Sequence, residues 1–188
     1  MKILNRPRLM KVHTVLAAFI LPVAIMFFVT GAFYTWGVKG AYETVVYNLD
    51  LENPIDGEVS ALVPLVTEAL AQQKIETPSG GAKIKRIGQS FRLEWTGSKK
   101  DIVLEPTKNP LIAKLTIKKT SWYRQFVQLH KAKGGTPFKV YAAIFATGLL
   151  LLLVTGFMMA WQTPKLRKLT LLSASLGLVV FFVMVIFS

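Results

Sequence analysis

The chain contains no cysteine, only two histidines and few acidic residues. The absence of cysteine excludes disulfides, thiolate metal sites and thiol nucleophiles. No Gly-rich phosphate-binding motif follows a predicted strand, so neither a dinucleotide-binding domain nor a nucleoside triphosphate loop is expected. Ten acidic residues stand against 23 lysines and arginines, a formal net charge of +13. Apolar residues form 52% of the 188 residues, which is more than one small soluble core buries.

Long runs without charge organise the rest of the chain. Residues 14–36, 140–164 and 169–188 contain no Asp, Glu, Lys or Arg. Each run reaches the roughly 20 residues that a helix needs to cross the hydrocarbon layer. We therefore predict a membrane protein with three transmembrane helices, at 14–36, 137–162 and 169–188, behind a basic leader at 1–13. The first helix is expected to be a retained anchor, because its apolar run is longer than a signal-peptide core and no cleavage site follows.

The basic residues that flank these helices predict the orientation of the chain. The leader and the turn expected at 163–168 carry lysine and arginine and no acid. The positive-inside rule places both in the cytoplasm, so residues 37–138 are expected outside. All ten acids lie in that outer segment, interspersed with its basic residues. This mixture is typical of a solvated surface, so the expected partner is membrane lipid and not nucleic acid.

The segment at 37–120 predicts a small extracytoplasmic α+β domain between the first and second membrane helices. Apolar residues recur at helical spacing from Val59 to Leu70. Alternation of apolar and polar residues then predicts half-buried antiparallel strands. The stronger strands are expected at 91–96 and 111–118, and weaker ones at 84–87 and 102–104.

Four acids lie close together before the predicted helix, at Asp50, Glu52, Asp56 and Glu58. Their carboxylate oxygens suit a bound cation. The alternative is turn and helix-capping chemistry around this Pro- and Gly-containing loop, which we favour.

Residues 121–135 predict a short amphipathic helix that lies on the outer membrane surface. Its apolar face consists of Trp122, Phe126 and Leu129. Gln128 is expected on the opposite, polar face, and the Gly-Gly pair at 134–135 is expected to end the helix. His130 flanks the apolar face, which directs it toward the membrane about one turn above the bilayer.

The second histidine, His13, lies at the cytoplasmic end of the first membrane helix. Taken singly, each histidine is either an interfacial anchor or a ligand. A bilayer core of roughly 30 Å separates them, so His13 and His130 of one protomer cannot hold the same iron. A two-fold axis along the membrane normal would bring each histidine to its own copy in a second protomer. Such a pair suits the two axial positions of a haem.

The membrane helices carry a repeated motif. Val-Thr-Gly followed five residues later by Trp occurs at 29–36 and again at 154–161. Because the two helices are expected to run in opposite directions, this would be a repeat of inverted topology; the alternative is a chance match between apolar segments. The repeat predicts that each Thr-Gly pair lines the site of the histidine on the same membrane face. The pairings are Thr30 and Gly31 with His130, and Thr155 and Gly156 with His13.

These residues resemble the PepSY-associated transmembrane proteins, most closely the small haem-containing inner-membrane ferric reductases of the VciB type. The resemblance rests on Val12-His13, an apolar helix that ends in Val-Thr-Gly, an outer α+β domain, Leu129-His130, and a second helix that ends in Val-Thr-Gly. It implies a homodimer in a bacterial inner membrane with a PepSY-like domain in the periplasm. It also implies one or two haem b groups per dimer, with His130 and His13 as the axial ligands of the iron.

The activity that this resemblance implies is electron transfer across the membrane to extracytoplasmic ferric iron or a ferric chelate, in support of ferrous iron uptake. The electron donor would be membrane quinol or a cytoplasmic reductase. Two alternatives stay open: a non-enzymatic membrane-anchored PepSY binding module, and a transporter accessory subunit that acts by contact alone.

Overall fold

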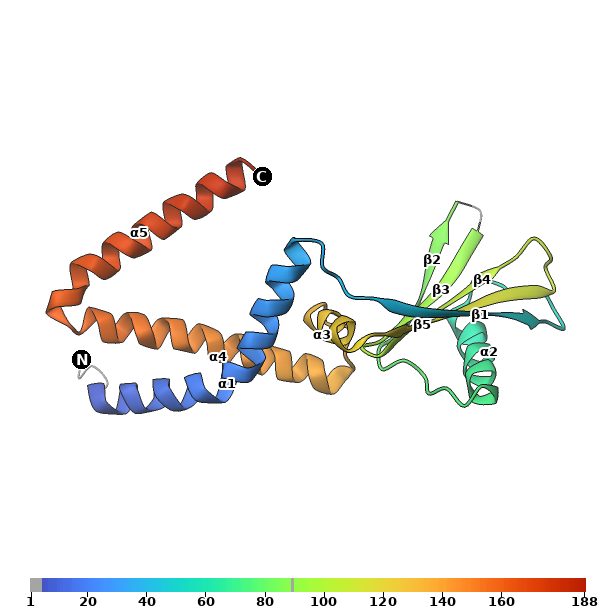
Figure 1. Cartoon of the computed structure of the whole chain (residues 1–188), viewed down its shortest axis with the longest axis horizontal. Helices are drawn as coiled ribbons and strands as arrows, with labels where there is room; N and C mark the ends of the chain where they lie inside the picture. The colour runs from blue at the N-terminus through green and yellow to red at the C-terminus, as the bar shows by residue number, and fades with distance from the viewer. Residues whose placement is uncertain (1–4, 89) are drawn as a thin grey trace. The chain divides into compact units, whose positions relative to one another are not determined.

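The computed structural model describes residues 5–88 and 90–188. By internal contacts these residues divide into two units, one formed by 5–24 with 143–188 and one by 25–142. The elements, in chain order (Figure 1), are α1 (Arg6–Thr35), β1 (Tyr42–Asp50), α2 (Val59–Gln72), β2 (Ala82–Ile87), β3 (Ser90–Thr96), β4 (Lys100–Pro106), β5 (Ile112–Thr120), α3 (Trp122–His130), α4 (Thr136–Trp161) and α5 (Pro164–Ile186).

Three helices, α1, α4 and α5, are long and apolar enough to cross a membrane, as the charge-free runs predict. No residue of α5 is buried, and its large apolar side chains are exposed. Side chains of this kind suit contact with lipid. Within the first unit, α1 and α4 approach closely at Gly148. A Cβ there would lie 3.4 Å from Ile20 Cγ2 and 3.5 Å from Leu16 Cδ1, so glycine permits the close packing of the two helices.

The ends of the membrane helices differ from those expected. The segment 163–168 was expected to be a turn, but α5 already begins at Pro164 and includes Lys165 and Arg167. Proline favours this first helical position because its φ is preset and its missing N–H would have no helical partner. Arg167 also turns back to donate to the carbonyl of Trp161 at 2.7 Å. At the other end of the chain, α1 begins at Arg6, so the described part of the basic leader is largely helical.

The second unit contains a five-stranded antiparallel sheet in the order β1-β5-β4-β3-β2. Helix α2 covers one face of this sheet (Figure 1). The core between them is built from alternate residues of the central strands and one face of α2, namely Leu62, Val66, Leu70, Leu93, Ile102, Leu104, Leu115 and Ile117. The alternation read from the sequence therefore predicts correctly which residues of β3 and β5 face the core.

Strand β1 was not expected from the sequence. It pairs with β5 along its whole length, and Asp50, expected in a loop, is its last residue. In the loop that follows, Asp56 Oδ1 accepts a hydrogen bond from the backbone N–H of Glu58 at 3.3 Å, beside the first turn of α2. Among the residues that the structure describes, no three His, Cys, Asp or Glu side chains gather as a metal site. The contact present in this loop is thus a turn contact.

Helix α3 is shorter than expected and docks by a different face. It begins after Ser121, whose Oγ accepts from the N–H of Arg124 at 3.3 Å, and ends at His130 rather than at the Gly-Gly pair. Ala132 just beyond has a φ of 56°, which turns the chain out of the helix. The placement of Gln128 on a solvated face is wrong. Gln128 is fully buried, whereas the apolar side chain of Trp122 is 76% exposed.

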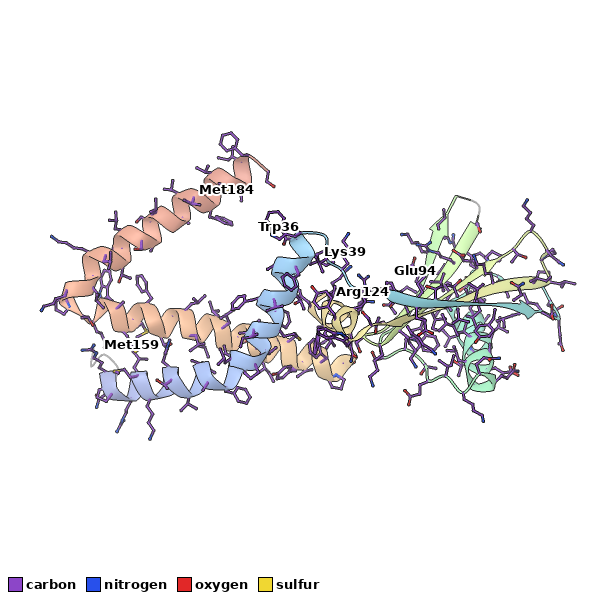
Figure 2. The ribbon with its side chains drawn as sticks, viewed as in Figure 1. Trp36, Lys39, Glu94, Arg124, Met159 and Met184 are labelled. Atoms are coloured by element: carbon purple, nitrogen blue, oxygen red, sulfur yellow. The ribbon has the colours of Figure 1, made fainter. Side chains whose placement is uncertain are left out.

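Gln128 is buried because it belongs to a polar network that ties α3 to the sheet. Asp101 on β4 is 7% exposed, and its Oδ2 accepts from the hydroxyl of Tyr42 at 2.8 Å and from Gln128 Nε2 at 2.8 Å. Lys133 Nζ lies 3.3 Å from the same oxygen. Arg124, labelled in Figure 2, donates to the Tyr42 hydroxyl at 2.9 Å. This network holds α3, and with it His130, in one position, although Gln128 Oε1 and Arg124 Nε are buried without a partner in it.

We predict that this network weakens at high pH. Burial raises the pKa of the Tyr42 phenol, opposed by the hydrogen bond from Arg124 and supported by the one to Asp101. The folded state therefore holds this proton more tightly than the unfolded chain does. The resulting stability is fully present below the ordinary tyrosine pKa of about 10 and is lost as pH rises through the folded pKa.

The measurement is thermal unfolding of the full chain in detergent between mildly and strongly alkaline pH, followed by circular dichroism. The difference in melting temperature between the wild type and Tyr42→Phe should shrink as the pH passes the tyrosine range. A difference that stays constant across that range would contradict the prediction.

Candidate functional site

His130, the last residue of α3, lies against α1. Its Nδ1 is 2.8 Å from Thr30 Oγ1, and Thr30 is only 3% exposed. The Phe27 ring packs on the imidazole with a centroid distance of 4.7 Å and a tilt of 39°. A Cβ at Gly31 would lie 3.2 Å from His130 Cε1, which is tighter than ordinary contact. Three successive features of one helix face therefore fix the ring: an aromatic support, a hydroxyl and a position that has to be small.

The direction of the Thr30 hydrogen bond defines the tautomer of His130. Thr30 Oγ1 lies 2.6 Å from the carbonyl oxygen of Met26, one turn earlier in its own helix. A hydroxyl has a single proton, and Thr30 donates it to that carbonyl. Its oxygen must then accept from the imidazole, so His130 carries its proton on Nδ1. The lone pair of a neutral ring is consequently on Nε2, which has no hydrogen bond to any residue between 5–88 and 90–188.

His13 on α1 makes the same arrangement with α4. Its Nδ1 is 2.9 Å from Thr155 Oγ1, and Thr155 Oγ1 donates to the carbonyl of Leu151 at 2.7 Å. A Cβ at Gly156 would lie 3.6 Å from His13 Cε1. Because the Thr155 hydroxyl donates its proton to Leu151, its oxygen accepts from the imidazole, so His13 also carries its proton on Nδ1. Its Nε2 likewise has no hydrogen-bond partner in the part of the chain that the structure describes.

The pairing of residues predicted from the repeated Val-Thr-Gly motif is thus confirmed: the threonine and histidine of each pair lie within hydrogen-bond distance. Each threonine bonds the histidine on the predicted partner segment, and the glycine after it lies against the same atom of that imidazole, Cε1. Two sites of one design therefore recur in the chain, one within each unit. The tryptophan that closes each motif does not contribute to the site. Trp36, labelled in Figure 2, is 86% exposed, as an interfacial anchor would be.

A pocket of about 320 Å³ opens beside His130. Thr30, Gly31 and Val127 contribute to its wall, and Tyr34 and Lys131 stand together at one side of it. Lys131 Nζ lies 3.5 Å from the Tyr34 hydroxyl and 5.4 Å from the centre of its ring. The pocket thus combines an apolar wall, an imidazole nitrogen with a free lone pair and one ammonium group. This combination suits a flat apolar ligand that carries an acidic substituent.

Sequence reasoning missed three residues that position His130. Phe27 was read only as part of an apolar run, although its position three residues before Thr30 places it on the same helix face. Asp101 and Gln128, which hold α3 on the sheet, come from segments 27 residues apart in the chain. The one signal in the sequence was Gln128, a polar residue two positions before His130 on the same short helix. Its partner Asp101 could not be predicted from the spacing of residues.

The family model described as the PepSY-associated TM region matches residues 3–163 of this chain. The chain belongs to the PepSY-associated transmembrane family. With its three membrane-spanning helices, it is a multi-pass membrane protein. No curated protein and no solved structure matches it.

The tautomers can be tested by nitrogen NMR of the ¹⁵N-histidine-labelled full chain in detergent, without added ligand, at an alkaline pH where free imidazole is neutral. We expect both histidines to show a protonated Nδ1 and an unprotonated Nε2. Thr30→Val should abolish this pattern for His130 and leave His13 unchanged, because it removes only one acceptor. His13→Gln assigns the two sets of signals.

Thr147→Val is the matched control, since the Thr147 hydroxyl bonds only to a carbonyl of its own helix, at 3.0 Å. It should leave both histidines unchanged. A wild-type protein whose histidines are protonated on Nε2 would contradict the assignment.

Proposed function

We propose that this chain is a haem b-containing protein of a bacterial inner membrane that reduces extracytoplasmic Fe(III), in support of ferrous iron uptake. The observation that carries the proposal is the pair of equivalent histidines. Each has Nδ1 bonded to a threonine, and its Nε2 has no partner among residues 5–88 and 90–188. A ring held in this way is prepared to give its remaining lone pair to a metal.

The residues around His130 fit a haem. Neutral imidazole nitrogen is an axial ligand of haem iron, and a hydrogen bond from Nδ1–H orients the ring and raises its basicity. Gly31 lets the imidazole approach α1 closely, and Lys131 could pair with a propionate. When bound, haem would supply one-electron transfer to a ferric ion. At the inner site, His13 and Thr155 offer the same ligand and hydroxyl, and Gly156 lies beside the His13 ring.

A homodimer completes each site. Each of the two sites contains one histidine of this chain. A haem with two protein ligands is suited to electron transfer and needs a second imidazole. A two-fold axis along the membrane normal supplies it, since His130 then faces its copy, and His13 its own copy, in a second protomer. The dimer would hold one haem if only the outer pair binds and two if both pairs bind.

The proposed orientation follows the flanking charges. The basic N-terminal residues and the basic first turns of α5 are assigned to the cytoplasm, and 37–138 to the periplasm. His13 is then the inner ligand and His130 the outer one, on the side of the ferric substrate. Because the sequence has no dinucleotide motif, electrons are assigned to an external donor, either membrane quinol or a cytoplasmic reductase.

Visible spectra of the purified protein test the proposal. The wild type in mild detergent should show a b-type haem spectrum that sharpens on reduction with dithionite. His130→Ala and His13→Ala should each remove the haem that the missing ring would hold. Thr30→Val should retain the outer haem but bind it about ten- to a hundredfold more weakly, since it loses only the support of the ligand. Thr147→Val serves again as the control, with an unchanged spectrum.

Reduction is tested directly by adding a ferric chelate to reduced protein from which excess dithionite has been removed. Reoxidation of the haem with formation of Fe(II) is the expected result. A preparation that remains colourless even when haem is supplied during expression would contradict the proposal. The non-enzymatic PepSY binding module or transporter accessory subunit would then be the better account.

A further inference from the structure

The face of the sheet opposite α2 is hollowed into a groove of about 330 Å³, which we call the sheet groove. Strand alternation explains its chemistry. Residues such as Leu93 and Leu115 point into the core beneath α2, so their neighbours on each strand point into the groove. With the exception of Val103, those neighbours are charged or polar, and they include Arg92, Glu94, Glu105, Lys114, Thr116 and Lys118. Glu94, labelled in Figure 2, lies on this sheet.

The three carboxylates of the groove are already engaged. Arg92 forms ion pairs with Glu94 and, at 3.8 Å, with Glu105. Asp101 accepts from Lys133 at 3.3 Å, in addition to the bonds that hold α3. Arg92 and Lys133 thus offset two of the three acidic charges, and with Lys114 and Lys118 the groove carries a net charge of +1.

Lys114 and Lys118 remain as unpaired cations. Neither forms an ion pair or a side-chain hydrogen bond with any residue in the described part of the chain. In the sheet register they face Glu105 and Asp101, the acids that the preceding ion pairs engage. They lie four residues apart on the same face of β5, a separation of about 14 Å along the strand, and Thr116 stands between them. Because each ammonium group stands on a flexible four-carbon stem, the two can close from either side on one ligand with more than one carboxylate.

Thr116 supports this assignment from the floor of the groove. It lies between the two lysines on β5 and is only 8% exposed. Its hydroxyl forms no hydrogen bond with another described residue, and solvent still reaches its oxygen, so a ligand in the groove can reach it too. Its neighbours across the strands are Val46 and Val103, so no acid lies directly beside it. A hydroxyl between two ammonium groups is a ready donor to a carboxylate.

We propose that the sheet groove binds a small polycarboxylate anion through Lys114, Lys118 and Thr116. This inference rests on the proposed function in one respect: the physiological ligand is then a ferric chelate of such an anion, which is the substrate of the reductase. The groove adjoins the segment of the outer histidine, because Lys133 lines it three residues after His130 and Asp101 is bonded to Gln128 two residues before. Substrate would thus be held on the domain that carries the outer ligand.

The first test uses citrate alone, with neither iron nor reductant, so that it does not depend on the proposed function. Isothermal titration of the full chain in detergent at fixed ionic strength should show saturable citrate binding. Lys114→Gln/Lys118→Gln should weaken it tenfold or more, and Thr116→Val by a smaller factor, because charge-assisted hydrogen bonds are the stronger ones. The control Lys108→Gln/Lys119→Gln removes the same charge from exposed lysines outside the groove and should leave binding unchanged.

Three results would overturn the groove assignment: no saturable citrate binding, equal weakening by both double variants, or acetate and phosphate binding as tight as that of citrate. Ferric citrate reduction is the second test, in which the groove double variant should raise KM and leave kcat and the haem spectrum unchanged. A wild type that binds citrate but reduces no ferric citrate would contradict the proposed function and leave the groove standing.

Discussion

The hydrogen bond between a threonine hydroxyl and a histidine Nδ1 is the interaction on which the account depends. It needs two things from the membrane helices: a threonine whose own proton is donated to its helix carbonyl, and a glycine next to it that lets the imidazole approach. Together these define which nitrogen carries the proton. The chain meets both requirements twice, with Thr30 for His130 and Thr155 for His13. A repeated hydrogen bond of this kind between distant segments is difficult to explain as packing alone.

The two sites differ in what holds the histidine. His13 lies within a membrane helix, so its position follows from the packing of α1 on α4. His130 lies at the end of a nine-residue helix that would not be stable in isolation. Asp101, with Tyr42 and Gln128, supplies the missing constraint by joining that helix to the sheet. The sheet domain thus positions His130 as well as carrying the sheet groove.

The membrane helices, part of the sheet and the partners of both histidines could be predicted from the sequence. The contacts that could not be predicted join segments that are distant in the chain. Charge-free runs and strand alternation report local burial, so they predict the three membrane helices and the core residues of β3 and β5. The Val-Thr-Gly repeat predicts which residues meet His13 and His130, because the spacing fixes depth in the membrane. Strand β1 was not predicted, because it is a half-exposed edge strand that pairs only with a strand far along the chain. Gln128 looked solvated because its partner, Asp101, is distant in sequence.

The central claim is that Nε2 of these histidines ligates haem iron. Because the chain has only two histidines, ¹⁵N-histidine labelling marks these two side chains and no others. Pulsed electron paramagnetic resonance of the labelled, oxidised haem protein would then detect ¹⁵N directly bound to low-spin iron. The account predicts this coupling in the wild type and its loss from the outer haem in His130→Ala. A bound haem without coupling to labelled histidine would contradict it.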